Sequence, residues 1–147
     1  MKRNIRKVAV LGSGIMGSRI ACHFANIGVE VLLLDIVPFE LTDAEQKQGL
    51  TKDSSQVRNR IVEEAFQATL KGKPASLYHK DFAKRITLGN FDDDMHKIKE
   101  CDWILEAVVE RLDIKKQVFE KVEKHRTKGT IISSNTSGIP IHMMLED

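Results

Sequence analysis

Cysteine, proline and aromatic residues are scarce in this chain of 147 residues. There are two cysteines and three prolines, and aromatic side chains make up 5% of the sequence. Cys22 and Cys101 have no second cysteine at the C-x-x-C spacing of zinc and redox sites, and we expect no metal centre. Two isolated cysteines indicate reduced thiols and favour a cytoplasmic protein.

A large excess of one charge and a long apolar run are also missing. The formal net charge is +2, which is too small to indicate a nucleic-acid partner. The basic residues 2–7 lead only into the short run VAVLG, far less than a signal peptide or a membrane span requires. Apolar residues at 41% and charged residues at 30% are typical of one globular domain with its own core.

Short apolar segments alternate with helical patterns along most of the chain. They predict buried parallel strands at residues 7–12, 29–35, 85–90, 102–108 and 130–135. The first two strands flank a helix over residues 15–26 that Gly28 ends, which gives a right-handed βαβ unit. This order predicts an α/β fold, a doubly wound parallel sheet of the Rossmann type.

The connection between the second and third strands is long, from residue 36 to about residue 85. A parallel crossover needs only about a dozen residues. Within the connection, residues 55–70 have helical periodicity, with Asp53 or Ser54 as the cap and Gly72 as the stop. We therefore expect a helical excursion within one domain, not a separate domain.

Three further helical segments are predicted near the later strands. Residues 113–128 are amphipathic, and we expect Gly129 to cap this helix. Residues 91–101 begin with acids, which favours a brief helix because the helix dipole stabilises them there. Pro140 is suited to the first turn of a helix.

Three glycines follow the first strand as G-x-G-x-x-G, namely Gly12, Gly14 and Gly17. Glycine within regular structure costs roughly 0.5–1 kcal/mol per residue, which indicates that something must approach this backbone closely. Gly12 permits a tight turn, Gly14 leaves room for a pyrophosphate, and Gly17 lets the helix pack on the sheet. The N–H groups at the start of that helix then bind the anion. A purely structural turn is the alternative.

Asp35 ends the second strand, 23 residues after Gly12 and close to the ~20 expected of a dinucleotide fold. Its carboxylate is suited to accept hydrogen bonds from the adenosine ribose, and its charge would repel a 2′-phosphate. This predicts NAD in preference to NADP. The alternative is that Asp35 only caps the strand end.

Three motifs, GSGIMGSRIA, EAVVERLDIKKQVF and SSNTSGI, closely resemble those of the NAD-binding domain of 3-hydroxyacyl-CoA dehydrogenases. The resemblance covers nearly the whole chain, and the excursion is similar to a helical hairpin of this family. It is greatest to the bacterial form fused to an enoyl-CoA-hydratase-like region. It implies an NAD-binding domain over residues 1–147 and the oxidation of (S)-3-hydroxyacyl-CoA to 3-oxoacyl-CoA in fatty-acid β-oxidation.

The resemblance also implies roles for individual positions. Those that bind the cofactor are the pyrophosphate turn of Gly12, Ser13, Gly14, Ile15, Met16 and Gly17, the ribose ligand Asp35, the backbone edge at Ala107 and Val108, and Glu110, Lys115 and Asn135 near the nicotinamide. Ser137 is the catalytic position, which faces the reacting oxygen of the substrate.

Sequence position and side-chain chemistry also favour a ligand-binding role for some of these positions, apart from the resemblance. Residues 133–138 span the carboxyl end of the strand predicted over residues 130–135, at the edge where open α/β sheets bind ligands. The hydroxyl of Ser137 is suited to hydrogen-bond an oxygen whose charge changes during hydride transfer. A simple turn or helix cap is the alternative for this segment, and a solvated surface pair is the alternative for Glu110 and Lys115.

One part of the family pattern is missing. The family's general base is a histidine in an H-F-F-N-P-like motif, paired with a glutamate further on, and neither motif occurs in the printed sequence. The family's helical C-terminal domain, which dimerises and closes over the acyl-CoA, is absent too. We therefore expect a fragment that binds NAD weakly and does not turn over. For the intact protein we expect an acyl-CoA substrate and a homo-oligomer.

Other functions remain open from the sequence. One is a non-catalytic NAD-binding module, and another is a dehydrogenase for β-hydroxyacids or sugar acids, against which SNTSGI and the long excursion argue. Lys52, Arg58 and Arg60 are candidates for binding CoA phosphates, although a solvated basic face is the simpler interpretation.

Overall fold

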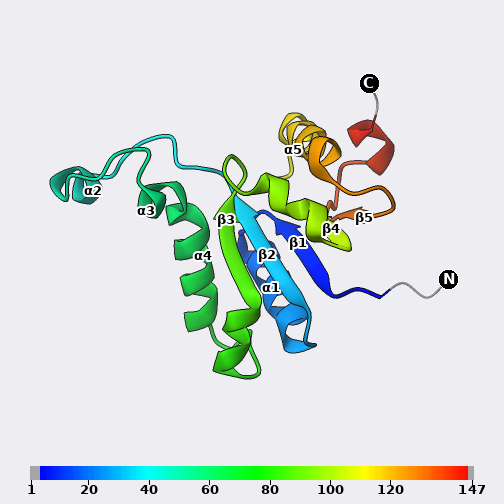
Figure 1. The fold of residues 1–147 in the computed structure, drawn as a ribbon, viewed down its shortest axis with the longest axis horizontal. Helices are drawn as coiled ribbons and strands as arrows, with labels where there is room; N and C mark the ends of the chain where they lie inside the picture. Colours follow the sequence, from blue (N-terminus) through cyan, green and yellow to red (C-terminus); the bar gives the residue numbers. More distant parts are fainter. Residues whose placement is uncertain (1–3, 146–147) are drawn as a thin grey trace.

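A parallel five-stranded sheet runs through the centre of the computed structural model, which describes residues 4–145 (Figure 1). The strands are β1 (Lys7–Leu11), β2 (Glu30–Asp35), β3 (Ile86–Asn90), β4 (Trp103–Glu106) and β5 (Ile131–Ser134). Their spatial order is β3-β2-β1-β4-β5, and every neighbouring pair is parallel. This is the order of a Rossmann fold, and the predicted fold class is confirmed.

Helices cover both faces of the sheet (Figure 1). α1 (Ile15–Asn26) and α4 (Arg60–Lys71) pack on one face. α5 (Leu112–His125) packs on the other face with the 3-10 helix η2 (Met95–Glu100). The sheet is therefore doubly wound, and its strands β1 and β2 are buried on both sides.

The central strand β1 shows why apolar residues run without interruption here. Val8 and Val10 join the cluster under α1 and α4, whereas Ala9 and Leu11 join the cluster under α5. All four are fully buried. Because successive side chains point to opposite faces, a strand covered on both faces needs apolar residues at every position.

The excursion between β2 and β3 is helical, as predicted, and contains three α-helices rather than one. α2 (Asp43–Lys47) and α3 (Ser55–Arg58) lie on an arm that extends away from the sheet, at the left of Figure 1. The unpredicted helix α2 begins with a capping box between Thr42 and Glu45. The 3-10 helix η1 (Lys80–Arg85) then leads into β3.

The single helix predicted over residues 55–70 is wrong at Asn59, where the backbone leaves helical geometry and separates α3 from α4. The Asn90 side-chain amide donates to Oδ1 of Asn59 at 2.8 Å. The neighbouring Arg58 makes a two-pronged ion pair with Asp93. These contacts tie the break to the turn after β3, which no helical periodicity can reveal.

The helices near the later strands differ from the prediction in one end and in type. α5 ends at His125, so the expected cap at Gly129 is wrong; Gly129 has a φ of 90° in the turn before β5. The brief helix over residues 91–101 is the 3-10 helix η2. Pro140 stands directly before the short 3-10 helix η3 (Ile141–Met144).

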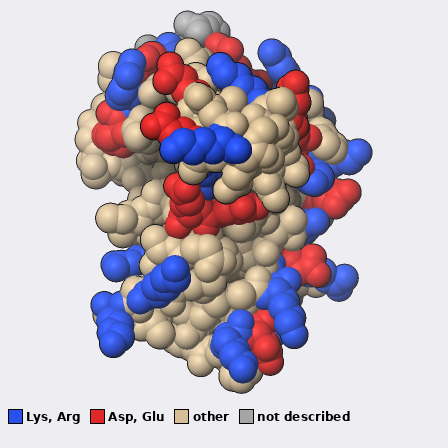
Figure 2. Space-filling view, turned by 90° about the vertical axis from the view of Figure 1, so that its left-hand side faces the viewer, with Lys and Arg blue, Asp and Glu red and all other residues tan. Residues whose placement is uncertain are grey.

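The surface in Figure 2 has mixed charge, and the two cysteines are buried. Acidic and basic side chains intermingle on the face shown in Figure 2, with acidic side chains gathered near its centre. Within residues 4–145, no helix is both long and apolar enough to cross a membrane. Burial raises the pKa of both thiols, to about 12 for Cys101, and so keeps them protonated.

Candidate functional site

A groove of about 800 Å³ opens at the carboxyl ends of the central strands. β1 continues into α1 on one face of the sheet and β4 continues into α5 on the other, so the groove lies where the connections diverge. Open α/β sheets bind ligands at this point. Eight predicted positions line the groove: Gly12, Gly14, Ile15, Met16, Asp35, Ala107, Val108 and Asn135.

The three glycines of the turn occupy different surroundings. A Cβ on Gly12 would lie 2.6 Å from the carbonyl oxygen of Ala107, and its φ of 104° disfavours other residues. A Cβ on Gly17 would lie 1.9 Å from the carbonyl oxygen of Gly12. A Cβ on Gly14 would meet nothing within 4 Å. Gly12 and Gly17 are thus required by packing, and Gly14 leaves open space above the start of α1.

The start of α1 is suited to bind an anion. Gly14 is its N-cap and supplies no side-chain cap, and the first turn holds no acidic residue. The first N–H groups of a helix have no partner within the helix, and its dipole favours negative charge there. A pyrophosphate fits this open, uncapped helix end.

Ser13 and Asp35 join the turn to the end of β2. The backbone N–H of Ser13 donates to Oδ2 of Asp35 at 2.7 Å, and the Ser13 hydroxyl donates to the same oxygen at 2.5 Å. Oδ1 of Asp35 accepts from the N–H of Ile36. Ser13 is buried beneath the groove, whereas Asp35 is half-buried and lines it, which holds the carboxylate at the groove wall.

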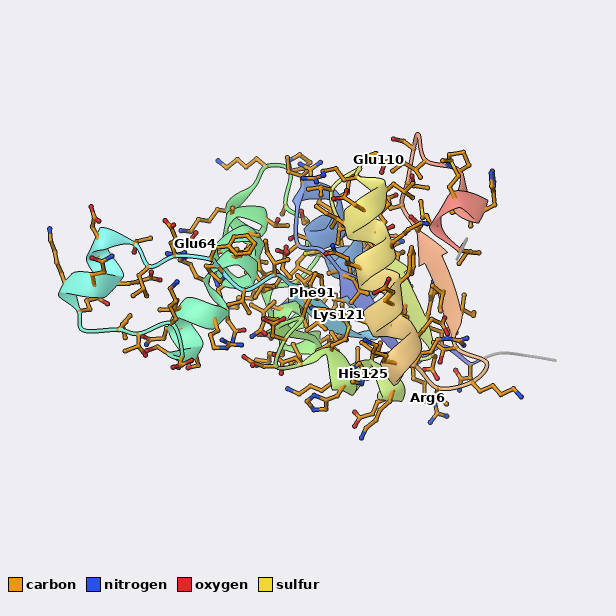
Figure 3. The ribbon with its side chains drawn as sticks, turned by 90° about the horizontal axis from the view of Figure 1, so that it is seen from above. Arg6, Glu64, Phe91, Glu110, Lys121 and His125 are labelled. Atoms are coloured by element: carbon orange, nitrogen blue, oxygen red, sulfur yellow. The ribbon has the colours of Figure 1, made fainter. Side chains whose placement is uncertain are left out.

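Apolar side chains form much of the groove wall. Ile15, Met16, Ile36 and Val109 line it and are exposed, Ile15 by 74%. Phe91 and Lys121 also line it, beside the middle of α5 in Figure 3. A concave apolar surface with a few polar groups is typical of a small-molecule site.

Glu110 and Lys115 are not a solvated surface pair. Lys115 is only 1% exposed, and its ammonium lies 2.8 Å from Oε1 of Glu106 and 3.2 Å from Oε2 of Glu110. Glu106, which is fully buried at the end of β4, was not among the positions predicted from the sequence. A glutamate that ends an otherwise apolar strand was the available signal.

Glu110 organises the loop after β5. Figure 3 shows it at the start of α5, beside that loop. Its Oε1 accepts from the hydroxyl of Thr136 and from the backbone N–H groups of Ser137, Gly138 and Ile139. The Thr136 hydrogen bond, together with these N–H groups and Lys115, lowers the pKa of Glu110 to about 2. Glu110 is therefore ionised at neutral pH.

Ser137 lies outside the groove, although the loop that carries it adjoins Asn135. Its side chain is exposed, and its residue does not line the groove. Ser13 and Gly17 are buried beneath the turn. The structure thus brings eight of the twelve predicted cofactor positions together in the groove, with Ser13 and Gly17 buried beneath it. Glu110 and Lys115 do not line the groove, and Ser137 lies beside Glu110.

Other candidates lie elsewhere. Arg58 pairs with Asp93, and Arg60 pairs with Glu45 at 2.7 Å, so both guanidinium groups already have carboxylate partners. None of the histidines described within residues 4–145 lines the groove. In the same range, no group of three or more His, Cys, Asp and Glu could hold a metal ion. A second hollow of about 810 Å³, between α5, β5 and η3, contains none of the predicted positions.

Comparison with known families gives one match over almost the whole chain. The model of the 3-hydroxyacyl-CoA dehydrogenase NAD binding domain matches residues 7–147. A probable 3-hydroxyacyl-CoA dehydrogenase from Bacillus subtilis is 57% identical over 146 residues, which are 99% of this chain and 18% of that protein. A protein of the same name from Deinococcus radiodurans is 44% identical over 142 residues, 97% of this chain and 37% of that protein. The chain thus spans well under half of either relative.

Solved structures give the same match at the level of the backbone. (S)-3-hydroxybutyryl-CoA dehydrogenase from Ralstonia eutropha has a TM-score of 0.61 and 27% identity, over 96% of this chain and 44% of that one. 3-hydroxybutyryl-CoA dehydrogenase from Escherichia coli has a TM-score of 0.61 and 26% identity, over 97% of this chain and 27% of that one.

Proposed function

Because this chain belongs to the family of 3-hydroxyacyl-CoA dehydrogenase NAD binding domains, we propose that its groove binds NAD for the oxidation of a 3-hydroxyacyl-CoA. The family membership inferred from the three sequence motifs is confirmed, and with it the cofactor NAD. The activity of the whole protein is proposed, since the relatives are much longer than this chain.

The glycine turn would hold the pyrophosphate. Gly14 leaves the space, and the N–H groups of the first turn of α1 donate to the phosphate oxygens. Asp35 would accept from the ribose hydroxyls at the end of β2, while Ser13 keeps its carboxylate oriented. The backbone at Ala107 and Val108 would form the edge beside the cofactor, because both residues line the groove.

The other end of the groove would receive the nicotinamide. Asn135 lines this end, and Glu110 and Lys115 lie just beyond it, at the start of α5. When bound, NAD⁺ supplies the acceptor for the hydride. The hydroxyl of Ser137 would hydrogen-bond the substrate oxygen, whose charge changes as the (S)-3-hydroxyacyl-CoA becomes a 3-oxoacyl-CoA.

The hydroxyl proton of the substrate also needs an acceptor. The groove lining contains Asp35 and no histidine among residues 4–145, and Asp35 is already bound to Ser13 at the adenosine end. We propose that the general base comes from outside these 147 residues. This chain alone would then bind the cofactor without turning over substrate.

The single observation that supports cofactor binding most strongly is the contrast among the glycines. Packing explains Gly12 and Gly17, but it leaves Gly14 without any neighbour that a side chain would meet. An approaching ligand accounts for that open position.

The test is calorimetric titration of the chain with NAD⁺ and with NADP⁺, followed by an absorbance assay with NAD⁺ and (S)-3-hydroxybutyryl-CoA. The proposal expects NAD⁺ to bind, NADP⁺ to bind more weakly, and NADH formation to stay at the level of the enzyme-free control. Equal affinity for both cofactors would contradict the role of Asp35, and rapid turnover would contradict the external base.

A further inference from the structure

The buried charge at the end of β4 is not accounted for by cofactor binding alone. Glu106 has no exposed surface and Lys115 has 1%, so both charges are removed from water. Removing two charges from water costs several kcal/mol per ion. Well-packed apolar residues of similar size often stabilise a protein as well as such a pair does. Stability alone therefore gives no clear reason for this pair.

Glu106 uses both of its oxygens to join three elements. Oε1 accepts from the Lys115 ammonium of α5 at 2.8 Å and from the N–H of Val108 at 2.8 Å. Oε2 accepts from Lys115 at 3.0 Å and from the hydroxyl of Ser134, the last residue of β5. The carbonyl oxygen of Glu106 also accepts from the N–H of Asn135 at 2.8 Å.

The residues on either side of this carboxylate are those that reach the groove. Val108 and Asn135 both line the groove, and each is held by an atom of Glu106. From Lys115 the connection continues to Glu110, whose other oxygen binds the loop 136–139. Glu106 thus lies at the centre of a network under one end of the groove, away from Asp35.

We propose that Glu106 is a positioning residue for the nicotinamide half of the dinucleotide. It acts through Lys115, Val108 and Ser134, and it fixes the ends of β4 and β5 relative to α5. The adenosine half, at Ser13 and Asp35, has its own hydrogen bonds and does not depend on Glu106. This inference rests on the proposed function, because it assigns the network to one half of the same ligand.

ADP-ribose tests the assignment, because it has the adenosine, the pyrophosphate and a ribose but no nicotinamide. Glu106→Gln keeps the size of the side chain and removes its charge. We expect it to weaken NAD⁺ binding by about tenfold or more, because Val108 and Ser134 lose the charged acceptor that holds the ends of β4 and β5 in place beside the nicotinamide half. We expect ADP-ribose to bind as it does to the unaltered chain. Bound NADH should also lose part of the fluorescence change that reports the surroundings of its nicotinamide.

Two further variants keep the test decisive. Glu100→Gln removes an exposed carboxylate that pairs with Lys7, far from the groove, and should change neither affinity. Ser134→Ala removes one partner of Glu106 and leaves the buried ion pair intact. If Glu106→Gln does not fold, Ser134→Ala should still weaken NAD⁺ several-fold and leave ADP-ribose unaffected.

The outcomes separate this inference from the proposed function. If the unaltered chain binds neither NAD⁺ nor ADP-ribose, the proposed function fails. If it binds both and a folded Glu106→Gln loses affinity for both equally, the role of Glu106 is only structural. Unchanged NAD⁺ affinity in Glu106→Gln, or in Ser134→Ala where Glu106→Gln does not fold, also overturns the inference.

Discussion

Gly17 and Gly12 are in direct contact across the turn between β1 and α1. A Cβ built on Gly17 would lie 1.9 Å from the carbonyl oxygen of Gly12, closer than any real contact allows. The neighbouring atom is backbone and cannot rotate away as a flexible side chain would. The start of α1 can therefore pack this closely on the end of β1 only because Gly17 has no side chain.

Gly17→Ala should destabilise the domain. Overpacking a close contact costs about 1–3 kcal/mol, and here the clash is with backbone, so we expect the upper part of that range. Urea denaturation followed by circular dichroism measures the change. Gly14→Ala is the matched control, because its Cβ meets nothing within 4 Å. Equal stability of the two variants would contradict the packing described for the turn.

Asp35→Asn should relax the choice between NAD and NADP. The substitution keeps an acceptor for Ser13 and removes the charge at the groove wall. One unit charge about 4 Å from a 2′-phosphate is worth about 1 kcal/mol in water and about 4 kcal/mol near a protein surface, so the ratio of the two dissociation constants should shift by about tenfold or more. Parallel calorimetric titrations measure it. A ratio that stays at the value of the unaltered chain would exclude Asp35 as the discriminating residue.

Lys115→Met should lower the free energy of unfolding by about 3–5 kcal/mol, because it leaves the buried carboxylate of Glu106 without its partner. The double variant Glu106→Gln/Lys115→Met removes both charges and should recover much of this loss. Urea denaturation of Lys115→Met, Glu106→Gln, the double variant and the unaltered chain gives the coupling energy. Additive losses would show that the two side chains do not form the buried pair described here.

The ionisation of Glu110 makes the free energy of unfolding depend on pH between about 2 and 4.5. Its pKa is lowered from the ordinary 4.5 to about 2 by the Thr136 hydroxyl, the loop N–H groups and Lys115. The folded state binds this proton less readily than the unfolded state does. The contribution of the Glu110 carboxylate to the free energy of unfolding is therefore complete above about pH 4.5 and is lost as the pH falls through 2.

The loss of stability in Glu110→Gln, relative to the unaltered chain, should therefore be largest above about pH 4.5. The difference in urea midpoint between the two proteins should be constant from neutral pH down to about pH 4.5 and shrink towards pH 2. Glu123→Gln, at an exposed carboxylate that pairs with Arg126, is the control and should show no such trend. A difference that does not vary with pH would contradict the assigned ionisation of Glu110.

The sequence predicted the sheet because its signals are local. The strand that contains Val8 and Val10 is apolar at every position, and Gly28, with a φ of 88°, directly follows the last turn of α1. The helix break at Asn59 was not predicted, because it depends on a hydrogen bond to the side chain of Asn90, which is 31 residues away. Local patterns cannot report a contact between a helix break and the end of a distant strand.

The glycine turn and Asp35 were likewise predictable, because spacing along one βαβ unit fixes where they meet. The burial of Lys115 was not predictable: the family resemblance placed Lys115 near the nicotinamide, and a solvated surface pair with Glu110 was the alternative. Its burial depends on Glu106, which reaches it from β4, and on Ser134 from β5. Three elements must pack before that site exists, and no single stretch of sequence contains it.

The account depends most on Gly14, and Gly14→Val tests it directly. The substitution should leave the chain folded, because nothing lies within 4 Å of the added Cβ, and should cost about 1 kcal/mol at most, because valine is a poorer N-cap than glycine. It should weaken NAD⁺ by about tenfold or more, since the side chain fills the space of the pyrophosphate. Calorimetric titration of a folded Gly14→Val chain that gives the dissociation constant of the unaltered chain would contradict the account.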